Sequence, residues 1–382
     1  MGTGASLVLG ALAACTASTS GRESGLGSGS PSPSGLGSPA GTAAPGRRWP
    51  GEWEQHDATL MSMPFKGAIY GRRVADAQRE WAGVAKAIAH FEPVKLIIPG
   101  SSPQMRALIG SEVKLIEMPY DDGWLRDNGP IFVTGSDGSR TGLDWGFNGW
   151  GGAFDKFGQT WHKDDLLPTP LLKDLGIPRE GVPMILEGGS VQSDGNGTIL
   201  TTAECLLNPD RNPSMNKDQI EATLLQQFGA RKVIWLPFGL IGDLTSGHVD
   251  GVAMWISRGR VIAQKDPGNP AEQERLAENL AVLRASTDAD GNPLDVVEFP
   301  ILPRGSFMGL PEASFTYLNF GFANGGVVVP VTGDAKKDRE GLGILREIIT
   351  DREIVGVPAA TINWAGGGVH CITQQLPLAG QD

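Results

Sequence analysis

Hydrophobic and polar positions follow one recurring pattern along most of the chain. A stretch with apolar residues at helical spacing is followed by a short aliphatic run that ends at a proline. This pattern predicts a helix and then a strand, because apolar residues recur every three to four positions on a helix face and proline interrupts a strand. We expect helices at 75–91, 219–228, 271–285 and 336–350, and strands at 58–63, 94–98, 113–118, 233–236, 296–299 and 353–357.

Pairs of short apolar runs lie between these units and are joined by glycine-containing turns, such as residues 194–197 and 324–326. Turns of this composition are typical of β-hairpins. Hairpins are predicted for 131–133 with 142–145, 191–193 with 198–201, 252–256 with 261–264, and 315–322 with 327–331. About five copies of one α/β unit predict circular or solenoid stacking, in which equivalent loops converge on one axis.

The first fifteen residues resemble a bacterial lipoprotein signal. Residues 7–14 form a short apolar core, and residues 12–15 read Leu-Ala-Ala-Cys, a pattern in which Cys15 is lipidated and becomes the new N-terminus. The apolar run is too short to cross a bilayer. No Lys or Arg precedes it, so a start further upstream and a chance apolar run are the alternatives.

A tether is predicted after this segment. Residues 16–46 are almost entirely Ser, Gly, Pro, Ala and Thr, which bury too little apolar surface to fold. We therefore expect a signal segment at 1–15, a disordered tether at 16–48 and a single α/β domain at 49–382. The expected location is the cell envelope, as an extracytoplasmic lipoprotein anchored through Cys15. Without a functional signal the protein would be cytoplasmic.

Charge and cysteine content narrow the function. The net charge is -11, and residues 1–48 contain three Arg and one Glu, so the remainder carries -13. An acidic body disfavours nucleic acid as a partner and is compatible with a cationic substrate. Besides Cys15, the chain has Cys205 in an apolar context typical of a structural thiol, and Cys371. A disulfide between these two is arithmetically allowed, although their spacing does not favour it, and no Cys-x-x-Cys metal motif is present.

Chemically active side chains stand in the loops beside the short strands. Each has an ordinary explanation: an inert buried thiol, a solvated turn, a surface pair, or an Asn on the wet face of a strand. His248 and Asp250 are two residues apart, so in an extended segment they would point to the same face. The candidates are Asp127, Glu187, His248, Asp250, Asn319 and Cys371.

Together these groups suit attack on a positively charged carbon. A thiolate is the strongest nucleophile among protein side chains at neutral pH. Carboxylates hold a guanidinium by fork-like hydrogen bonds. A histidine can give a proton to departing ammonia and later take one from water.

These residues lie in motifs that resemble, in order, those of the agmatine deiminase and bacterial-type peptidylarginine deiminase family. The resemblance covers about residues 49–377 and implies a five-bladed, pseudo-fivefold α/β-propeller of the guanidine-modifying enzymes. The motifs are Trp53-Glu54-x-His56, Trp124-Leu125-Arg126-Asp127-Asn128-Gly129-Pro130, Glu187-Gly188-Gly189-Ser190, Gly247-His248-Val249-Asp250, Tyr317-Leu318-Asn319-Phe320 with Ala323-Asn324-Gly325-Gly326, and Gly366-Gly367-Gly368-Val369-His370-Cys371-Ile372-Thr373-Gln374-Gln375.

The resemblance implies catalytic roles. Cys371 would form an amidino-cysteine intermediate, and His248 would be the general acid and base. Asp127 and Asp250 would bind the guanidinium nitrogens, and Glu187 would orient His248 and stabilise its charge.

Supporting roles follow in the same way. Trp124 would wall the pocket along the substrate's alkyl chain, Asn319 would add a hydrogen bond, and His370 would be structural. The resemblance implies no metal and no organic cofactor. The expected partner is a small cationic guanidine, and assembly into a homo-oligomer is left open.

The implied activity is that of a hydrolase in putrescine and polyamine synthesis, which converts agmatine and water to N-carbamoylputrescine and ammonia. Residues 61–64 lack the Trp that agmatine deiminases commonly have before the proline, residues 251–255 differ from the usual stretch, and a lipoprotein-like start is unusual for an intracellular enzyme. One alternative is an extracytoplasmic deiminase that converts peptidyl or free arginine to citrulline. Others are a non-catalytic envelope protein that binds cationic ligands and a Cys-His protease, which needs no paired carboxylates.

Overall fold

The computed structural model describes residues 46–66, 70–153, 155, 158, 160–265, 268–307, 310–314 and 316–380. The chain divides into two units, Met1–Pro39 and Ala40–Asp382, and every described residue belongs to the second. The signal-like segment with Cys15, and the tether up to residue 45, lie outside the described residues. None of the described helices combines the length and the apolar character needed to cross a membrane.

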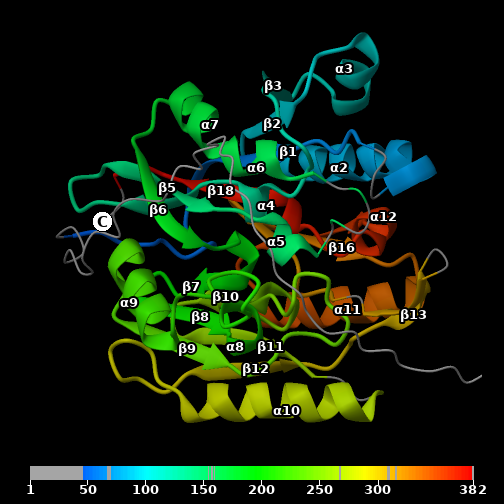
Figure 1. The fold of residues 1–382 in the computed structure, drawn as a ribbon. Helices are drawn as coiled ribbons and strands as arrows, with labels where there is room; N and C mark the ends of the chain where they lie inside the picture. Colours follow the sequence, from blue (N-terminus) through cyan, green and yellow to red (C-terminus); the bar gives the residue numbers. More distant parts are fainter. Residues whose placement is uncertain are drawn as a thin grey trace, which may run out of the picture. The chain divides into compact units, whose positions relative to one another are not determined.

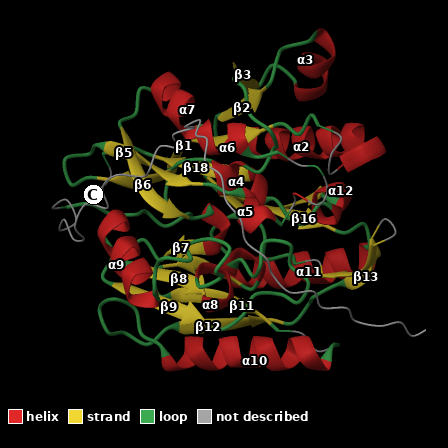
Figure 2. Ribbon diagram, in the orientation of Figure 1, coloured by secondary structure: helices red, strands yellow, loops and turns green. Residues whose placement is uncertain are grey.

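Five sheets share one arrangement of three strands (Figures 1 and 2). The first strand pairs antiparallel with the second, and the second pairs parallel with the third. In sequence order they are β4 (Ile131–Thr134), β5 (Arg140–Gly146) and β6 (Arg179–Ile185); β7 (Val191–Ser193), β8 (Thr198–Thr202) and β9 (Lys232–Leu236); β10 (Ala253–Ser257), β11 (Arg260–Gln264) and β12 (Asp295–Phe299); β15 (Gly321–Ala323), β16 (Gly326–Val331) and β17 (Glu353–Pro358); and β18 (Thr373–Pro377), β1 (His56–Ser62) and β2 (Val94–Ile98).

Two further elements extend this pattern. The last sheet gains a fourth strand, β3 (Val113–Glu117), parallel to β2. A separate hairpin consists of β13 (Arg304–Phe307) and β14 (Leu310–Ser314).

A helix connects the two parallel strands of each sheet, because a parallel pair requires a crossover. These helices are α2 (Val74–Ala89), α7 (Pro168–Leu175), α9 (Lys217–Phe228), α10 (Pro270–Ala285) and α11 (Ala335–Ile348). Their starts follow from local chemistry. Asn216 and Gln219 form a capping box at α9, and Asn269 accepts two backbone hydrogen bonds before the proline that begins α10. Shorter helices are η1 (Gly71–Arg73), α3 (Pro103–Ile109), α5 (Gly149–Gly152), α6 (His162–Leu166), α8 (Ala203–Leu206) and α12 (Ala360–Trp364).

The predicted helices, strands and hairpins are confirmed with shifts of a few residues, with one exception. The strand expected at 315–322 is limited to β15 at Gly321–Ala323. The preceding backbone is drawn into other bonds: the carbonyl of Asn319 accepts from the amide of His370 at 3.1 Å, and its side-chain oxygen accepts from the amide of Cys371 at 3.3 Å. Residues 316–320 therefore turn instead of pairing with β16.

The strand β18 joins the two ends of the described body. It pairs antiparallel with β1, with Thr59 opposite Gln375 and Met61 opposite Thr373. The Thr-Gln-Gln-Leu-Pro sequence of β18 lacks an apolar pattern, so the sequence did not predict this strand. The pairing fixes the segment immediately before β18, which contains Cys371.

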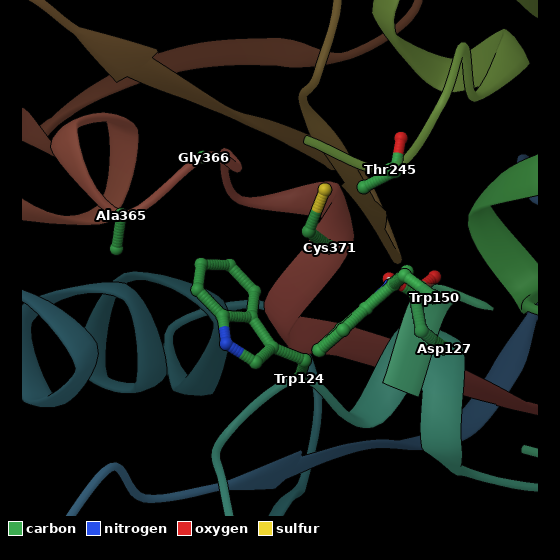
Figure 3. A pocket seen from close by; sticks show the side chains of 7 residues that line it. All are labelled: Trp124, Asp127, Trp150, Thr245, Ala365, Gly366 and Cys371. Atoms are coloured by element: carbon green, nitrogen blue, oxygen red, sulfur yellow. The ribbon is translucent and has the colours of Figure 1, made fainter. Parts of the chain in front are cut away.

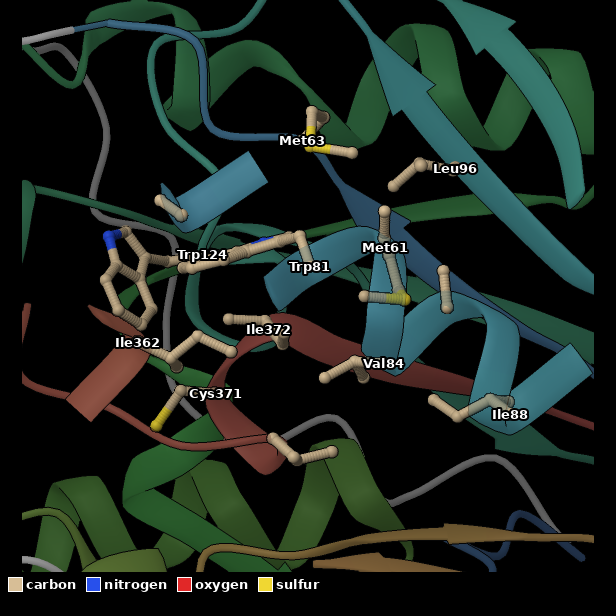
Figure 4. Close-up of a cluster of buried hydrophobic side chains, with 14 of the residues drawn as sticks. Met61, Met63, Trp81, Val84, Ile88, Leu96, Trp124, Ile362, Cys371 and Ile372 are labelled. Carbon is tan, nitrogen blue, oxygen red and sulfur yellow. The ribbon is translucent and has the colours of Figure 1, made fainter. Parts of the chain in front are cut away.

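The apolar cluster around α2 packs against the segment that contains Cys371. Trp81 of α2 packs against Trp124 edge to face, with ring centroids 5.6 Å apart. Met61, Ile372 and Cys371 belong to the same buried cluster (Figure 4). The thiol is thus presented from a rigid, close-packed base.

Candidate active site

The candidate residues occupy equivalent positions in the five repeating units. A short helical turn precedes the first strand in four of them: α4 (Leu125–Asn128) before β4, η3 (Gly188–Ser190) before β7, η4 (Val249–Gly251) before β10, and η5 (His370–Ile372) before β18. In the fifth unit the turn at 316–320 precedes β15. These turns or the residues just before them carry Asp127, Glu187, His248, Asp250, Asn319 and Cys371.

The three glycines before the His-Cys pair are required by close approach. Gly366 has a φ of +102°. A Cβ on Gly367 would lie 2.5 Å from the Trp124 ring and 3.2 Å from Cys371 Sγ, and one on Gly368 would lie 2.5 Å from Asn319 Oδ1. Only glycine fits here without displacing these groups.

A small pocket opens at Cys371, which is 4% exposed. Aromatic rings and small residues line most of it, and a carboxylate stands among them (Figure 3). The lining residues are Trp124, Asp127, Trp150, Thr245, Ala365, Gly366 and Cys371. The mixture of flat apolar walls and a buried negative charge suits a planar cation on an alkyl chain.

Cys371 lies in a negative environment. Its Sγ is 3.5 Å from Asp250 Oδ2. Burial, followed by the charges of Asp250 and Asp127, raises the pKa of the Cys371 thiol well above its ordinary value. Without a cation in the pocket, the raised pKa favours the neutral thiol of Cys371.

Asp250 is the end of a buried row of alternating charges. Its Oδ2 lies 2.8 Å from Nδ1 of His370, whose Nε2 lies 3.0 Å from both oxygens of Glu52. Glu52 also accepts from Arg126 Nη1 at 3.1 Å. Burial alone would raise the pKa of both carboxyls, but these partners prevail: they lower the pKa of Asp250, and that of Glu52 to about 2.

His370 keeps its proton in this row. Burial and Arg126 favour the neutral ring, but Glu52 and Asp250 together raise the pKa of His370. Its structural role was predicted, but its direct contact with Asp250 was not.

Asp127 is held by two donors. The backbone amide of Gly189 donates to Oδ1 and Trp150 Nε1 donates to Oδ2, both at 2.9 Å. Burial and the charges of Asp250 and Glu187 nevertheless raise the pKa of Asp127 to about 6. Trp150 reaches this carboxylate from a left-handed backbone conformation, with a φ of 56°, which is strained for a bulky residue.

His248 stands between two carboxylates. Its Nδ1 is 3.8 Å from Asp127 Oδ1, and its Nε2 is 3.9 Å from Glu187 Oε2. Burial opposes protonation, but Asp127, Cys205 and Glu187 outweigh it and raise the pKa of His248 well above its ordinary value. Among the described residues, neither ring nitrogen has a hydrogen-bond partner, so both are available to a ligand.

Arg211 fixes Glu187 on the far side of this pair. Its Nε donates to Glu187 Oε1 at 3.1 Å, and its Nη2 donates to the carbonyl of Thr245 at 2.7 Å. The charge of Arg211, with that of His248, overcomes the effect of burial and lowers the pKa of Glu187. Glu187 is therefore ionised beside the imidazole, as an orienting role requires.

The expectation that His248 and Asp250 lie in an extended segment is wrong. Val249–Gly251 forms a 3₁₀ turn, because the amide of His248 is held by Asp243 Oδ2 at 3.0 Å and the amide of Val252 by the carbonyl of Val249 at 3.0 Å. The two side chains still converge. A Cβ on Gly189 would lie 2.6 Å from His248 Nδ1 and 2.9 Å from Asp250 Oδ2.

Two supporting residues are also placed by the structure. Trp124 lines the pocket, and its Nε1 donates to Asp122 Oδ2 at 3.0 Å. Asn319 is buried instead of lying on a wet strand face. Its Nδ2 donates to the carbonyl of Asp250 at 3.4 Å, so it bridges the turns that carry Asp250 and Cys371.

Sequence reasoning missed four residues at this site: Glu52, Trp150, Cys205 and Arg211. All four act through contacts with residues distant in the chain. Glu52 stands immediately before the Trp-Glu motif, which is the one signal that could have drawn attention to it.

A family model provides independent evidence. Residues 48–377 match the model of the Porphyromonas-type peptidyl-arginine deiminases. The chain belongs to this family. It is accordingly a hydrolase that acts on guanidino carbon–nitrogen bonds, as the motifs predicted, with a mixed α/β fold.

Individual relatives agree with this assignment. The chain is 38% identical over 351 residues to an agmatine deiminase of Stutzerimonas stutzeri, covering 86% of this chain and 95% of that protein. It is similar in structure to the agmatine deiminase of Enterococcus faecalis, with a TM-score of 0.79, 32% identity, and coverage of 87% and 96% of the two chains. A Cys-to-Ser variant of the C. jejuni agmatine deiminase with substrate bound gives a TM-score of 0.77 and 27% identity, with coverage of 88% and 97%.

The close approach at Gly367 generates a test. In Gly367→Ala the new methyl group must displace the Trp124 ring or Cys371, so we expect guanidine-dependent ammonia release to fall on the order of 100-fold in kcat/KM. Gly343→Ala is the matched control, because a Cβ there meets no atom within 4 Å and the residue lies inside α11. Equal activity of the two variants would contradict the predicted crowding.

Proposed function

We propose that the protein hydrolyses the guanidinium group of agmatine to N-carbamoylputrescine and ammonia through an amidino-cysteine intermediate at Cys371. The observation that supports this most directly is the distance of 3.5 Å between Cys371 Sγ and Asp250 Oδ2, in a pocket also lined by Asp127. A thiol and two carboxylates that face one small space are suited to a substrate that is both cationic and electrophilic. The agmatine deiminases among the similar proteins support agmatine as the substrate.

Substrate binding would activate the nucleophile. The guanidinium places positive charge beside Asp127 and Asp250, the groups whose charges raise the pKa of Cys371. Binding therefore lowers that pKa, and the thiol loses its proton to solvent. Trp124 and Trp150 cover the planar group and exclude water from it.

Two chemical steps would follow. The Cys371 thiolate bonds to the guanidinium carbon, one carbon–nitrogen bond breaks, and the nitrogen leaves as ammonia with a proton from His248. His248, now neutral, takes a proton from water as the water oxygen bonds to the same carbon. The carbon–sulfur bond then breaks and the new hydroxyl group loses its proton to solvent, which releases the neutral carbamoyl product and regenerates the thiolate. Glu187 and Arg211 would orient His248 through both steps.

The five similar sheets support a pseudo-fivefold propeller as the architecture of this site. Neighbours in sequence are also neighbours in space: α4 contacts β18 and η3, η3 contacts η4, and α2 contacts β16 and β17. One apolar cluster joins the sheet of β10 and β11 to that of β15 and β16. Five turns arranged about one axis would bring the six candidate side chains to a common centre, two of them from the turn before β10.

An extracytoplasmic deiminase of peptidyl or free arginine is the second candidate, and the lipoprotein-like start favours it. The absence of a Trp before Pro64 supports this second candidate less strongly than the lipoprotein-like start does. Met61 and Met63 are fully buried in the cluster around α2, and neither is among the residues that line the pocket. This departure thus changes the core and not the walls of the site.

Ammonia release and ureido product from agmatine, arginine and an arginyl peptide test the function. We expect agmatine to give the highest kcat/KM, and Cys371→Ser to lose activity by several orders of magnitude. Acid quenching during turnover should trap an amidino adduct on Cys371, detected by mass spectrometry. Wild-type rates from Cys371→Ser would contradict the mechanism, and inactivity of wild-type protein on all three compounds would favour a cation-binding protein.

The pH dependence reports on Asp127. With its pKa raised to about 6, this group becomes protonated as the pH falls through that value and no longer pairs with a guanidinium, so kcat/KM should fall there. A bound cation favours the carboxylate, so kcat should hold to lower pH. In Asp127→Asn the fall of kcat/KM near pH 6 should disappear from the weak residual activity. The variant Asp295→Asn, at an exposed residue, should retain this fall. If the fall of kcat/KM at acidic pH is unchanged in Asp127→Asn, another group is responsible for it.

We propose that the protein is a lipoprotein of the cell envelope, anchored through Cys15, because residues 12–15 match a lipidation signal. When the full chain is expressed in a bacterium supplied with a tagged fatty acid, the wild-type protein should carry the tag and be found in the membrane fraction. Cys15→Ala should remain unlabelled, and Cys205→Ala should be labelled like the wild type. Unlabelled wild-type protein in the soluble cytoplasmic fraction would contradict this location.

A further inference from the structure

Three side chains with metal-binding atoms meet beside the pocket in a group that the proposed hydrolysis uses only in part. Glu187, Cys205 and His248 each offer one ligand atom, and these three atoms lie within 4.8 Å of one another. They come from three separate segments: the residue before η3, helix α8 and the residue before η4. All three are buried, and Cys205 has no role in the proposed chemistry.

Two of the three atoms have no hydrogen bond. Among the described residues, neither Glu187 Oε2 nor His248 Nε2 has a hydrogen-bond partner, although the residues are 0% and 2% exposed and the two atoms form only a loose ion pair at 3.9 Å. Cys205 Sγ makes one long hydrogen bond of 3.9 Å to the carbonyl of Thr245. Buried polar atoms are usually paired, so two ligand atoms without hydrogen bonds beside a weakly bonded thiol indicate a ligand between them.

Two carboxylates flank the imidazole of His248, where a bound ion would replace a proton. Glu187 is ionised, and Asp127 lies 3.8 Å from the other nitrogen of His248. Arg211 offsets one of these negative charges through its ion pair with Glu187. A thiolate, an imidazole and a carboxylate together form a ligand set that Zn²⁺ prefers, with bonds of about 2.0–2.3 Å.

We propose that Glu187, Cys205 and His248 form an inhibitory site for a thiophilic divalent cation of the Zn²⁺ class. On binding, the Cys205 thiol and the His248 imidazolium each release a proton to solvent, and bonds form from sulfur, Nε2 and Oε2 to the ion. A water molecule completes the tetrahedron. Thr245 both lines the pocket and contacts Cys205, so the site is reached from the pocket.

Occupancy would switch the enzyme off. The lone pair of His248 Nε2 is then committed to the ion, and the ring can no longer carry protons to ammonia or from water. This consequence rests on the proposed role of His248, whereas the binding of the ion does not. The two parts can therefore fail separately.

Cobalt(II) is the probe for binding, because a cobalt–thiolate bond gives a near-ultraviolet charge-transfer band. Chelator-treated full-length protein should develop the band with one ion per chain. Cys371→Ser should retain it, and Cys205→Ser should lose it. A band that is lost in Cys371→Ser and kept in Cys205→Ser would place the ion on the nucleophile and overturn the site, as would the absence of any band.

Zinc inhibition is the second measurement. Zn²⁺ should inhibit ammonia release reversibly, with recovery on adding chelator, and Cys205→Ser should require at least about tenfold more Zn²⁺ for half-inhibition of its own activity. Equal sensitivity of the two proteins would overturn the proposal. If Cys205→Ser folds poorly, the thermal unfolding of wild type and Cys371→Ser should both shift upward with Zn²⁺, and no shift would count against the site. A cobalt band without inhibition would instead contradict the catalytic role of His248.

Discussion

The concentration of buried negative charge around one thiol is the constraint on which the site depends. Asp127, Glu187 and Asp250 are all within 4% of full burial, and an ionised carboxylate without a partner is costly in such a place. Two of these three carboxylates have a buried basic side chain as a partner. Arg211 stabilises the charge of Glu187, and His370 stabilises that of Asp250. Asp127 is balanced least, and it is the one of the three whose pKa lies above its ordinary value.

This imbalance makes the pocket suited to a guanidinium. Each carboxylate has its position fixed before substrate arrives, so little reorganisation is needed when a planar cation enters. The same charge keeps Cys371 protonated while the pocket is empty, which protects it from oxidation and from unrelated electrophiles. Reactivity and recognition thus arise from the same electrostatic arrangement.

The repeating unit supplies the geometry. The turn before the first strand of each sheet leads into an antiparallel strand pair, which is a hairpin in four of the sheets and the β18–β1 pair in the fifth. The functional groups therefore sit on short, rigid connections instead of long loops. Hydrogen bonds also join one turn to another, as in the bonds that Asn319 accepts from the segment before β18. Glycines at 189, 367 and 368 allow these turns to approach one another closely.

Local sequence patterns predicted the helices, the hairpins, the repeat and the six candidate side chains, because each depends on residues near one another in the chain. Helix Val74–Ala89, for example, follows from its apolar residues at helical spacing. The remainder depends on contacts across the fold. The conformations around Asn319 and His248 are set by hydrogen bonds to other segments, and nothing in the sequence near Glu52, Trp150, Cys205 or Arg211 reveals a partner more than twenty residues away.

The pairing of β1 with β18 affects when the enzyme becomes active during synthesis. Strand β1 leaves the ribosome early, but its antiparallel partner follows only after all the other sheets have been made. Closing so long a segment is entropically expensive and slow, so it is a late step of folding. Cys371 is joined directly to β18, and its carboxylate partners belong to earlier units. An incomplete chain consequently holds these carboxylates without Cys371, and the pocket is complete only when the body closes.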